Sequence, residues 1–106
     1  MPYIKQNRRT EISESPELGN FSECGSLVEN VGELNWVITL ICHNYILAKE
    51  TYLSKGKTYS VLNEVVGALE CAKLELYRTI AAPYEDKKRQ ENGNISELDG
   101  KYEYGE

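Results

Sequence analysis

A chain of 106 residues has room for one hydrophobic core, because two cores would each bury too little apolar surface to be stable. Its 41% hydrophobic and 27% charged residues are ordinary globular proportions, which argues against disorder over the whole length. The net charge of -5 repels a phosphate backbone and argues against nucleic-acid binding. We therefore predict a single small domain over residues 1–106.

The cysteines and the start of the chain indicate the compartment. Cys24, Cys42 and Cys71 cannot all pair with one another, and none lies in a C-x-x-C arrangement, so neither a disulfide framework nor a zinc site is predicted. The chain opens on polar residues rather than a signal-peptide pattern, and no apolar run is long enough to span a bilayer. We expect a protein of the cytoplasm that does not bind membranes.

Residues 1–31 are polar, contain Pro16, Gly19 and Gly25, and show only scattered apolar positions. This composition is typical of turns and loops. We predict an extended N-terminal arm in which Ser26 caps a short turn.

The first strong periodic pattern predicts a helix over residues 33–52. Apolar residues recur at three- and four-residue steps along one face, and further apolar residues lie on the other side. A helix that is apolar nearly all round must be covered from more than one direction, by the arm or by a second copy of the chain. The residues predicted to form a protein-binding or oligomer interface are Trp36, Leu40, Tyr45, Ile46 and Leu47.

A second pattern predicts a helix over residues 59–82, joined to the first by a short connection. Short connections favour antiparallel neighbours, so the fold class is all-α and built on an antiparallel helical hairpin. Pro83 predicts a break or kink, because proline lacks the amide donor and disfavours helical geometry at Ala82. The helix then continues to about residue 91, and residues 94–106 form an irregular C-terminal tail.

The residue types that carry catalysis are poorly arranged. His43 follows Cys42 directly, and adjacent helical side chains point about 100 degrees apart, so the two do not form a nucleophile and base. The acids Glu64, Glu70 and Glu75 spread around their helix instead of converging on a metal. We predict no catalytic residue, no metal ligand and no cofactor.

Two asparagines lie among the apolar residues of the predicted helices. If Asn35 or Asn63 is buried, a polar contact there would set the register of the hairpin. The alternative is that both are exposed or act as local caps.

Three blocks of sequence carry a family resemblance. They are PYIKQ at 2–6 with a following Arg8-Arg9 pair, GELNWVIT at 32–39, and NEVVGALECAKLELYR at 63–78 with APYEDKK at 82–88. The chain resembles a family of short uncharacterised proteins found in tailed phages, prophages and their bacterial hosts. The resemblance implies no assigned catalytic residues, and a phage setting implies an accessory role, such as inhibition of host defence machinery.

Three function hypotheses follow. The first is a non-enzymatic phage or mobile-element protein that binds a host protein, for example as an inhibitor of a host defence system, and forms a homo-oligomer. The second is an oligomeric binder or sponge for a small ligand such as a nucleotide, since rings and guanidinium groups hold such molecules. The third is an enzyme whose site forms between chains. The candidate ligand-binding residues are Tyr3, Arg8, Arg9, Tyr77, Arg78 and Tyr84.

Overall fold

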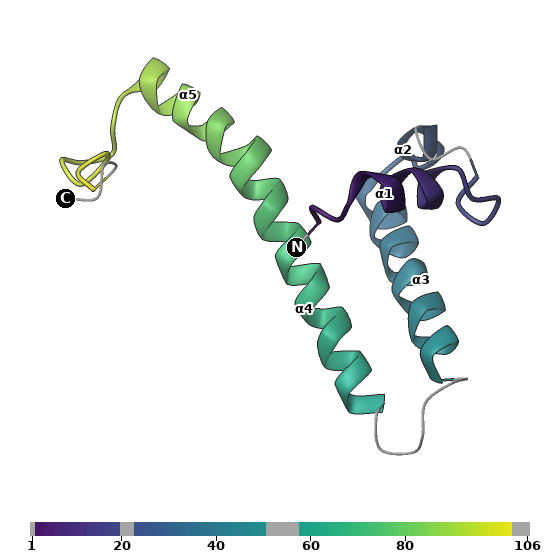
Figure 1. The fold of residues 1–106 in the computed structure, drawn as a ribbon. Helices are drawn as coiled ribbons and strands as arrows, with labels where there is room; N and C mark the ends of the chain where they lie inside the picture. Colours follow the sequence, from purple (N-terminus) through teal and green to yellow (C-terminus); the bar gives the residue numbers. More distant parts are fainter. Residues whose placement is uncertain (1, 20–22, 51–57, 103–106) are drawn as a thin grey trace. The chain divides into compact units, whose positions relative to one another are not determined.

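The computed structural model describes residues 2–19, 23–50 and 58–102, and every regular element in these ranges is a helix (Figure 1). The all-α prediction is therefore confirmed. The elements are α1 (Gln6–Ser13), α2 (Cys24–Leu27), α3 (Val31–Glu50), α4 (Thr58–Leu76), the π-helix η2 (Tyr77–Ala81) and α5 (Ala82–Asn92).

The chain divides into two compact units, Met1–Glu70 and Cys71–Glu106, with the division inside α4. In the first unit, α3 and the beginning of α4 run in opposite directions, as the predicted hairpin requires (Figure 1). The connection predicted between them, and the last two residues of the predicted first helix, lie outside the described residues. That residues 1–106 form one domain stays a prediction.

Helix α3 begins two residues earlier than predicted because of a cap in the preceding turn. The Asn30 Oδ1 atom accepts a hydrogen bond from the Glu33 amide at 2.9 Å. The Glu33 carboxylate in turn accepts from the Glu29 amide and from Asn30 Nδ2, both at 3.0 Å. This is the reciprocal logic of a capping box, which satisfies amide donors that a helix start otherwise leaves unpaired.

The prediction of an extended N-terminal arm is wrong over α1 and α2. Helix α1 has no capping side chain and no apolar stripe, and it is supported by local polar contacts. The Arg8 guanidinium and the Glu11 carboxylate pair at 2.9 Å, one turn apart. Ser26 lies inside α2, where its hydroxyl donates to the Glu23 carbonyl at 2.8 Å, so it does not cap this turn through a backbone amide.

The interruption predicted at Pro83 takes the form of a π-helix rather than a break. Ala82 keeps helical dihedrals, with φ -63° and ψ -46°, so the prediction that proline disfavours helical geometry there is wrong. The wider π-helical turn immediately precedes Pro83, and a π-bulge is a common way to fit a residue that cannot join the α-helical ladder. The helix continues to Asn92 and ends at Gly93, whose φ of 95° is readily adopted by glycine.

The tail after α5 is irregular as far as the structure describes it, to residue 102. Its turns are held locally. The Ile95 amide donates to the Asp99 carboxylate at 2.8 Å, and the Leu98 amide donates to the Ser96 hydroxyl at 3.1 Å. The predicted irregular tail is confirmed over these residues.

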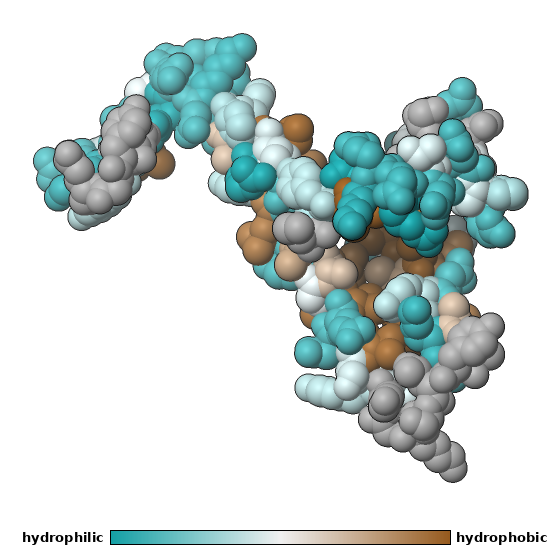
Figure 2. All heavy atoms as spheres, in the orientation of Figure 1, coloured by the Kyte–Doolittle hydropathy of each residue, from teal (hydrophilic) through white to brown (hydrophobic). Residues whose placement is uncertain are grey.

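Very little of the described chain is buried. Val61, on α4, is the one described residue that is buried, at 6% exposure. Figure 2 shows brown, apolar residues gathered in a hollow in the first unit, where α3 and α4 face each other. Folded domains normally bury more apolar surface than this. The exposed apolar faces are therefore candidate interaction surfaces.

Candidate protein-binding surface

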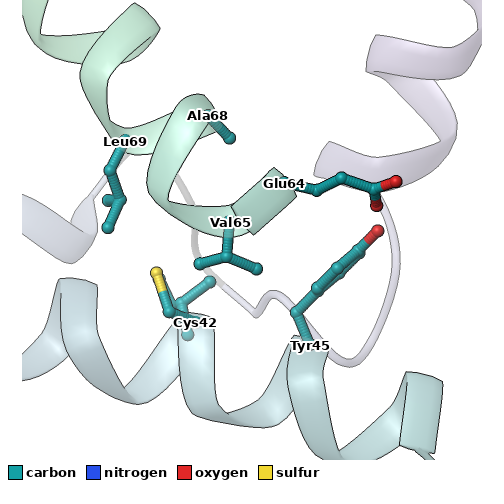
Figure 3. A pocket seen from close by; sticks show the side chains of 7 residues that line it. Cys42, Tyr45, Glu64, Val65, Ala68 and Leu69 are labelled. Carbon is teal, nitrogen blue, oxygen red and sulfur yellow. The ribbon is translucent and has the colours of Figure 1, made fainter. Parts of the chain in front are cut away.

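The inner face of α3 is the face turned toward α4. Ile41, Cys42 and Tyr45 line a pocket of about 350 Å³ there, and the facing wall comes from Glu64, Val65, Ala68 and Leu69 of α4 (Figure 3). Cys42 and Val65 are half-buried. The walls are apolar apart from one carboxylate, so the pocket is the partly closed seam of the hairpin.

Tyr45 belongs to this inner face, although it is one of the residues predicted to form the interface. Figure 3 shows its ring extending from α3 with the hydroxyl toward the carboxylate of Glu64. The Lys49 ammonium lies over the same ring, 5.3 Å from its centroid. Ile46 is half-buried. Ile46 is therefore the least exposed of the five predicted interface residues, whereas Tyr45 is 44% exposed but lies on the face turned toward α4.

The other three residues form what we call the outward stripe, which consists of Trp36, Leu40 and Leu47. They are separated by four and seven residues, which places them on one side of a helix with His43 between them. Their exposed fractions are 64%, 40% and 61%, with α1 and α2 in place. The described part of the N-terminal arm therefore leaves this stripe open. Cover by the arm, one of the two predicted ways of covering this helix, is not seen in these residues.

The predicted ligand-binding residues fall into both units. Tyr3, Arg8 and Arg9 lie in the first, where Tyr3 and Arg9 line a common pocket and Arg8 is paired with Glu11. Tyr77, Arg78 and Tyr84 lie in the second, on η2 and α5. There Arg78 is paired with Glu75, and the Lys88 ammonium lies 5.6 Å from the centroid of the Tyr84 ring.

The structure thus brings together one pair from this set, Tyr3 and Arg9. Their pocket has apolar walls from Ile12 and Leu18, which the sequence analysis did not single out. Recognising a helix over residues 6–13 would have placed Arg9 and Ile12 within one turn of each other.

Residues 1–95 match the family model of a domain of unknown function, DUF6899. The chain belongs to this family. Searches of curated proteins and of solved structures found no match. The family assignment agrees with the uncharacterised family expected from the three sequence blocks.

In this DUF6899 chain, neither Asn35 nor Asn63 forms a buried contact with the described residues. Asn35 and Asn63 are both exposed, and Asn35 Oδ1 accepts a hydrogen bond from the Thr39 hydroxyl at 3.0 Å. Both asparagines therefore match the second alternative, in which they are exposed or act locally. The described residues give no support to the hypothesis that they set the register of the hairpin.

The three cysteines of the DUF6899 chain are free thiols. Cys24 and Cys71 are exposed, whereas Cys42 is half-buried against α4. His43 is exposed and is not among the residues that line the Cys42 pocket. Across the described ranges, no three histidine, cysteine or acidic side chains converge on a metal position, and no helix is long and apolar enough to cross a bilayer.

Proposed function

We propose that this protein is a non-enzymatic accessory protein of a phage or another mobile element. It acts in the host cytoplasm by binding a host protein, and inhibition of a host defence system is the form of this activity that we favour. The proposal needs a surface that a partner would cover, and the outward stripe of α3 is that surface.

The observation that carries the proposal is the exposure of Trp36, Leu40 and Leu47 on one side of α3. Taking large side chains at about 150–250 Å² each, the three expose roughly 300 Å² of mainly apolar surface. An apolar patch of this size on a small protein is typical of an interaction site. Tryptophan is also the residue most enriched among those that dominate binding energy.

Charges near the stripe indicate the chemistry of the partner. Glu33 and Glu50 lie near its two ends, whereas Lys49 lies over the Tyr45 ring on the inner face. The chain as a whole carries a net charge of -5. A partner surface with an apolar centre and basic residues at its rim would complement both features, and such complementarity raises association rates and disfavours wrong partners. A second copy of the chain is the competing occupant, but it fits less well because it would bring the same acids to the interface.

Photo-crosslinking in host cells tests the proposal. A photoreactive amino acid at position 40 reports on the outward stripe, and the same residue at position 49 is the matched control on the inner face. We expect one host protein to be crosslinked from position 40 and not from position 49. We also expect the double variant Trp36→Ser and Leu47→Ser to lose most of this product, since removing hot-spot residues costs about 2 kcal/mol or more each.

Two outcomes would contradict the proposal. A product with twice the mass of the chain would identify a second copy as the occupant and make the stripe an oligomer interface. Equal crosslinking from positions 40 and 49 would show that the stripe has no specific partner. The claim that the protein is not an enzyme has a separate test, a turnover screen of the purified protein with divalent metals. Any specific reaction would overturn that claim.

A further inference from the structure

A second pocket, of about 610 Å³, lies beside α1 in the first unit and uses none of the outward-stripe residues. Tyr3 and Ile4 contribute from the segment before α1, Arg9 and Ile12 from the helix, and Leu18 from the turn after it. Volumes of about 300–1,000 Å³ are typical of pockets that hold small molecules. The pocket combines apolar walls with one cation.

Arg9 is the cation, and the structure holds it in place. Its Nε donates to the Ile4 carbonyl at 2.8 Å, and its guanidinium carbon lies 5.9 Å from the centroid of the Tyr3 ring. The side chain is half-buried. The guanidinium is planar, and the bond at Nε restricts its orientation, so its two Nη groups can form the paired hydrogen bonds that phosphate and carboxylate groups accept.

The neighbouring arginine shows why Arg9 is different. Arg8 is exposed and its charge is balanced by the Glu11 carboxylate at 2.9 Å. Within the described part of the chain, Arg9 has no carboxylate partner, and its hydrogen bond is to a neutral carbonyl. A partly desolvated charge without a counter-ion is unfavourable, and an anionic ligand would supply that counter-ion.

The rest of the pocket combines apolar side chains with hydroxyl groups. Ile4, Ile12 and Leu18 provide apolar contact area. The hydroxyls of Thr10 and Ser13 donate to the carbonyls of Gln6 and Thr10 at 3.1 and 3.2 Å. Since their protons are used in this way, their oxygen lone pairs are left to accept hydrogen bonds from a ligand.

We infer that this pocket binds a small anion that carries a flat ring, which is the chemistry of a nucleoside monophosphate. The phosphate would lie on the Nη groups of Arg9, and the ring would stack beside Tyr3 against the apolar walls. The site lies within one chain and involves Tyr3 and Arg9, so it requires neither the residues of the second unit nor an oligomer.

Titration calorimetry with adenosine monophosphate tests the inference. We expect saturable binding by the full chain and at least tenfold weaker binding by Arg9→Gln. Arg8→Gln is the matched control, because it removes the same charge one residue away and does not line the pocket, and we expect less than a twofold change. Tyr3→Leu is a second variant that keeps the Arg9 bond to Ile4, and it should also weaken binding several-fold.

Further arms of the same experiment separate the contributions. Adenosine without the phosphate should bind at least tenfold more weakly than the monophosphate, and inorganic phosphate should compete with the monophosphate. Absence of binding by the unmodified chain at millimolar ligand would overturn the inference. Equal losses from Arg8→Gln and Arg9→Gln would also overturn it, because they would show a general charge effect. Neither result bears on the crosslinking from position 40, so the two proposals stand or fall separately.

Discussion

The two faces of α3 are both apolar in sequence, yet the structure covers one of them in part, with Ile41 still 59% exposed, and the described residues leave the other open. On the inner face, Cys42 is half-buried against Val65 of α4. On the outward stripe, Trp36 and Leu47 each expose more than half of their surface. The difference arises because one neighbouring helix can cover one side of a cylinder and no more. Apolar periodicity therefore locates the surfaces that need cover, and only the packing of the helices shows which of these surfaces are covered.

The largest effect should come from charging the covered face. Val61→Asp places a carboxylate at a position that is 6% exposed and should cost about 3 kcal/mol of unfolding free energy, because burial disfavours the charged form. The matched control is Val66→Asp on the same helix, where the side chain is 65% exposed, and it should cost less than about 1 kcal/mol. Urea unfolding followed by circular dichroism measures both. Equal losses would mean that both sides of α4 are covered.

A smaller effect should come from the start of α3, which both faces share. Asn30→Ala removes the acceptor of the Glu33 amide and should cost about 1 kcal/mol, a typical value for a lost cap. Asn35→Ala, within α3, is the control and should cost nothing, because alanine favours a helix interior more than asparagine does. The same urea unfolding applies. A greater loss from Asn35→Ala would point to a buried role for Asn35 that its exposure does not show.

Thiol labelling should sharpen the comparison between faces further. In single-cysteine variants, we expect Cys42 to react several-fold more slowly than Cys71, since Cys42 is half-buried against α4 and Cys71 is exposed. The measurement is the rate of reaction with a neutral thiol reagent in native buffer. Equal rates for the two thiols would show that the contact between α3 and α4 opens faster than Cys42 reacts, so that α4 gives this face no lasting cover.

The smallest effect on stability should come from the outward stripe itself. Trp36→Ser alters a residue that is 64% exposed, so the isolated chain should change by no more than about 0.5 kcal/mol. Measuring the unfolding midpoint at several protein concentrations separates the alternatives. A large loss that grows with concentration would reveal a second copy on the stripe. A large loss independent of concentration would show that the chain covers its own stripe.

Local sequence accounted for much of the fold, and the errors have identifiable causes. The last helix, predicted to continue to about residue 91, ends at Asn92, and both long helices followed from their apolar period. The start of α3 was misplaced because the Asn30-x-x-Glu33 signal of a cap was overlooked. Helix α1 was missed because its support is polar and local, as in the Arg8 pair with Glu11, and leaves no apolar stripe to detect.

The candidate sites were less predictable than the helices. The sequence indicated that Trp36, Leu40 and Leu47 need a partner, and that tyrosine and arginine residues suit a ligand. It did not show that Tyr45 lies on the inner face, or that Arg9 shares a pocket with Tyr3 while Arg8 pairs with Glu11. Adjacent residues of one helix point in different directions, so identical side chains one position apart meet different surroundings.

The sequence by itself determined the helical class, the near positions of α3, α4 and α5, and the excess of apolar surface on α3. These properties depend on contacts between residues a few positions apart, and the chain carries that information locally. Only the tertiary structure decided which face of α3 meets α4 and which arginine lies beside a tyrosine ring. Those outcomes depend on how elements distant in sequence pack together, because burial belongs to a surface and its neighbour jointly.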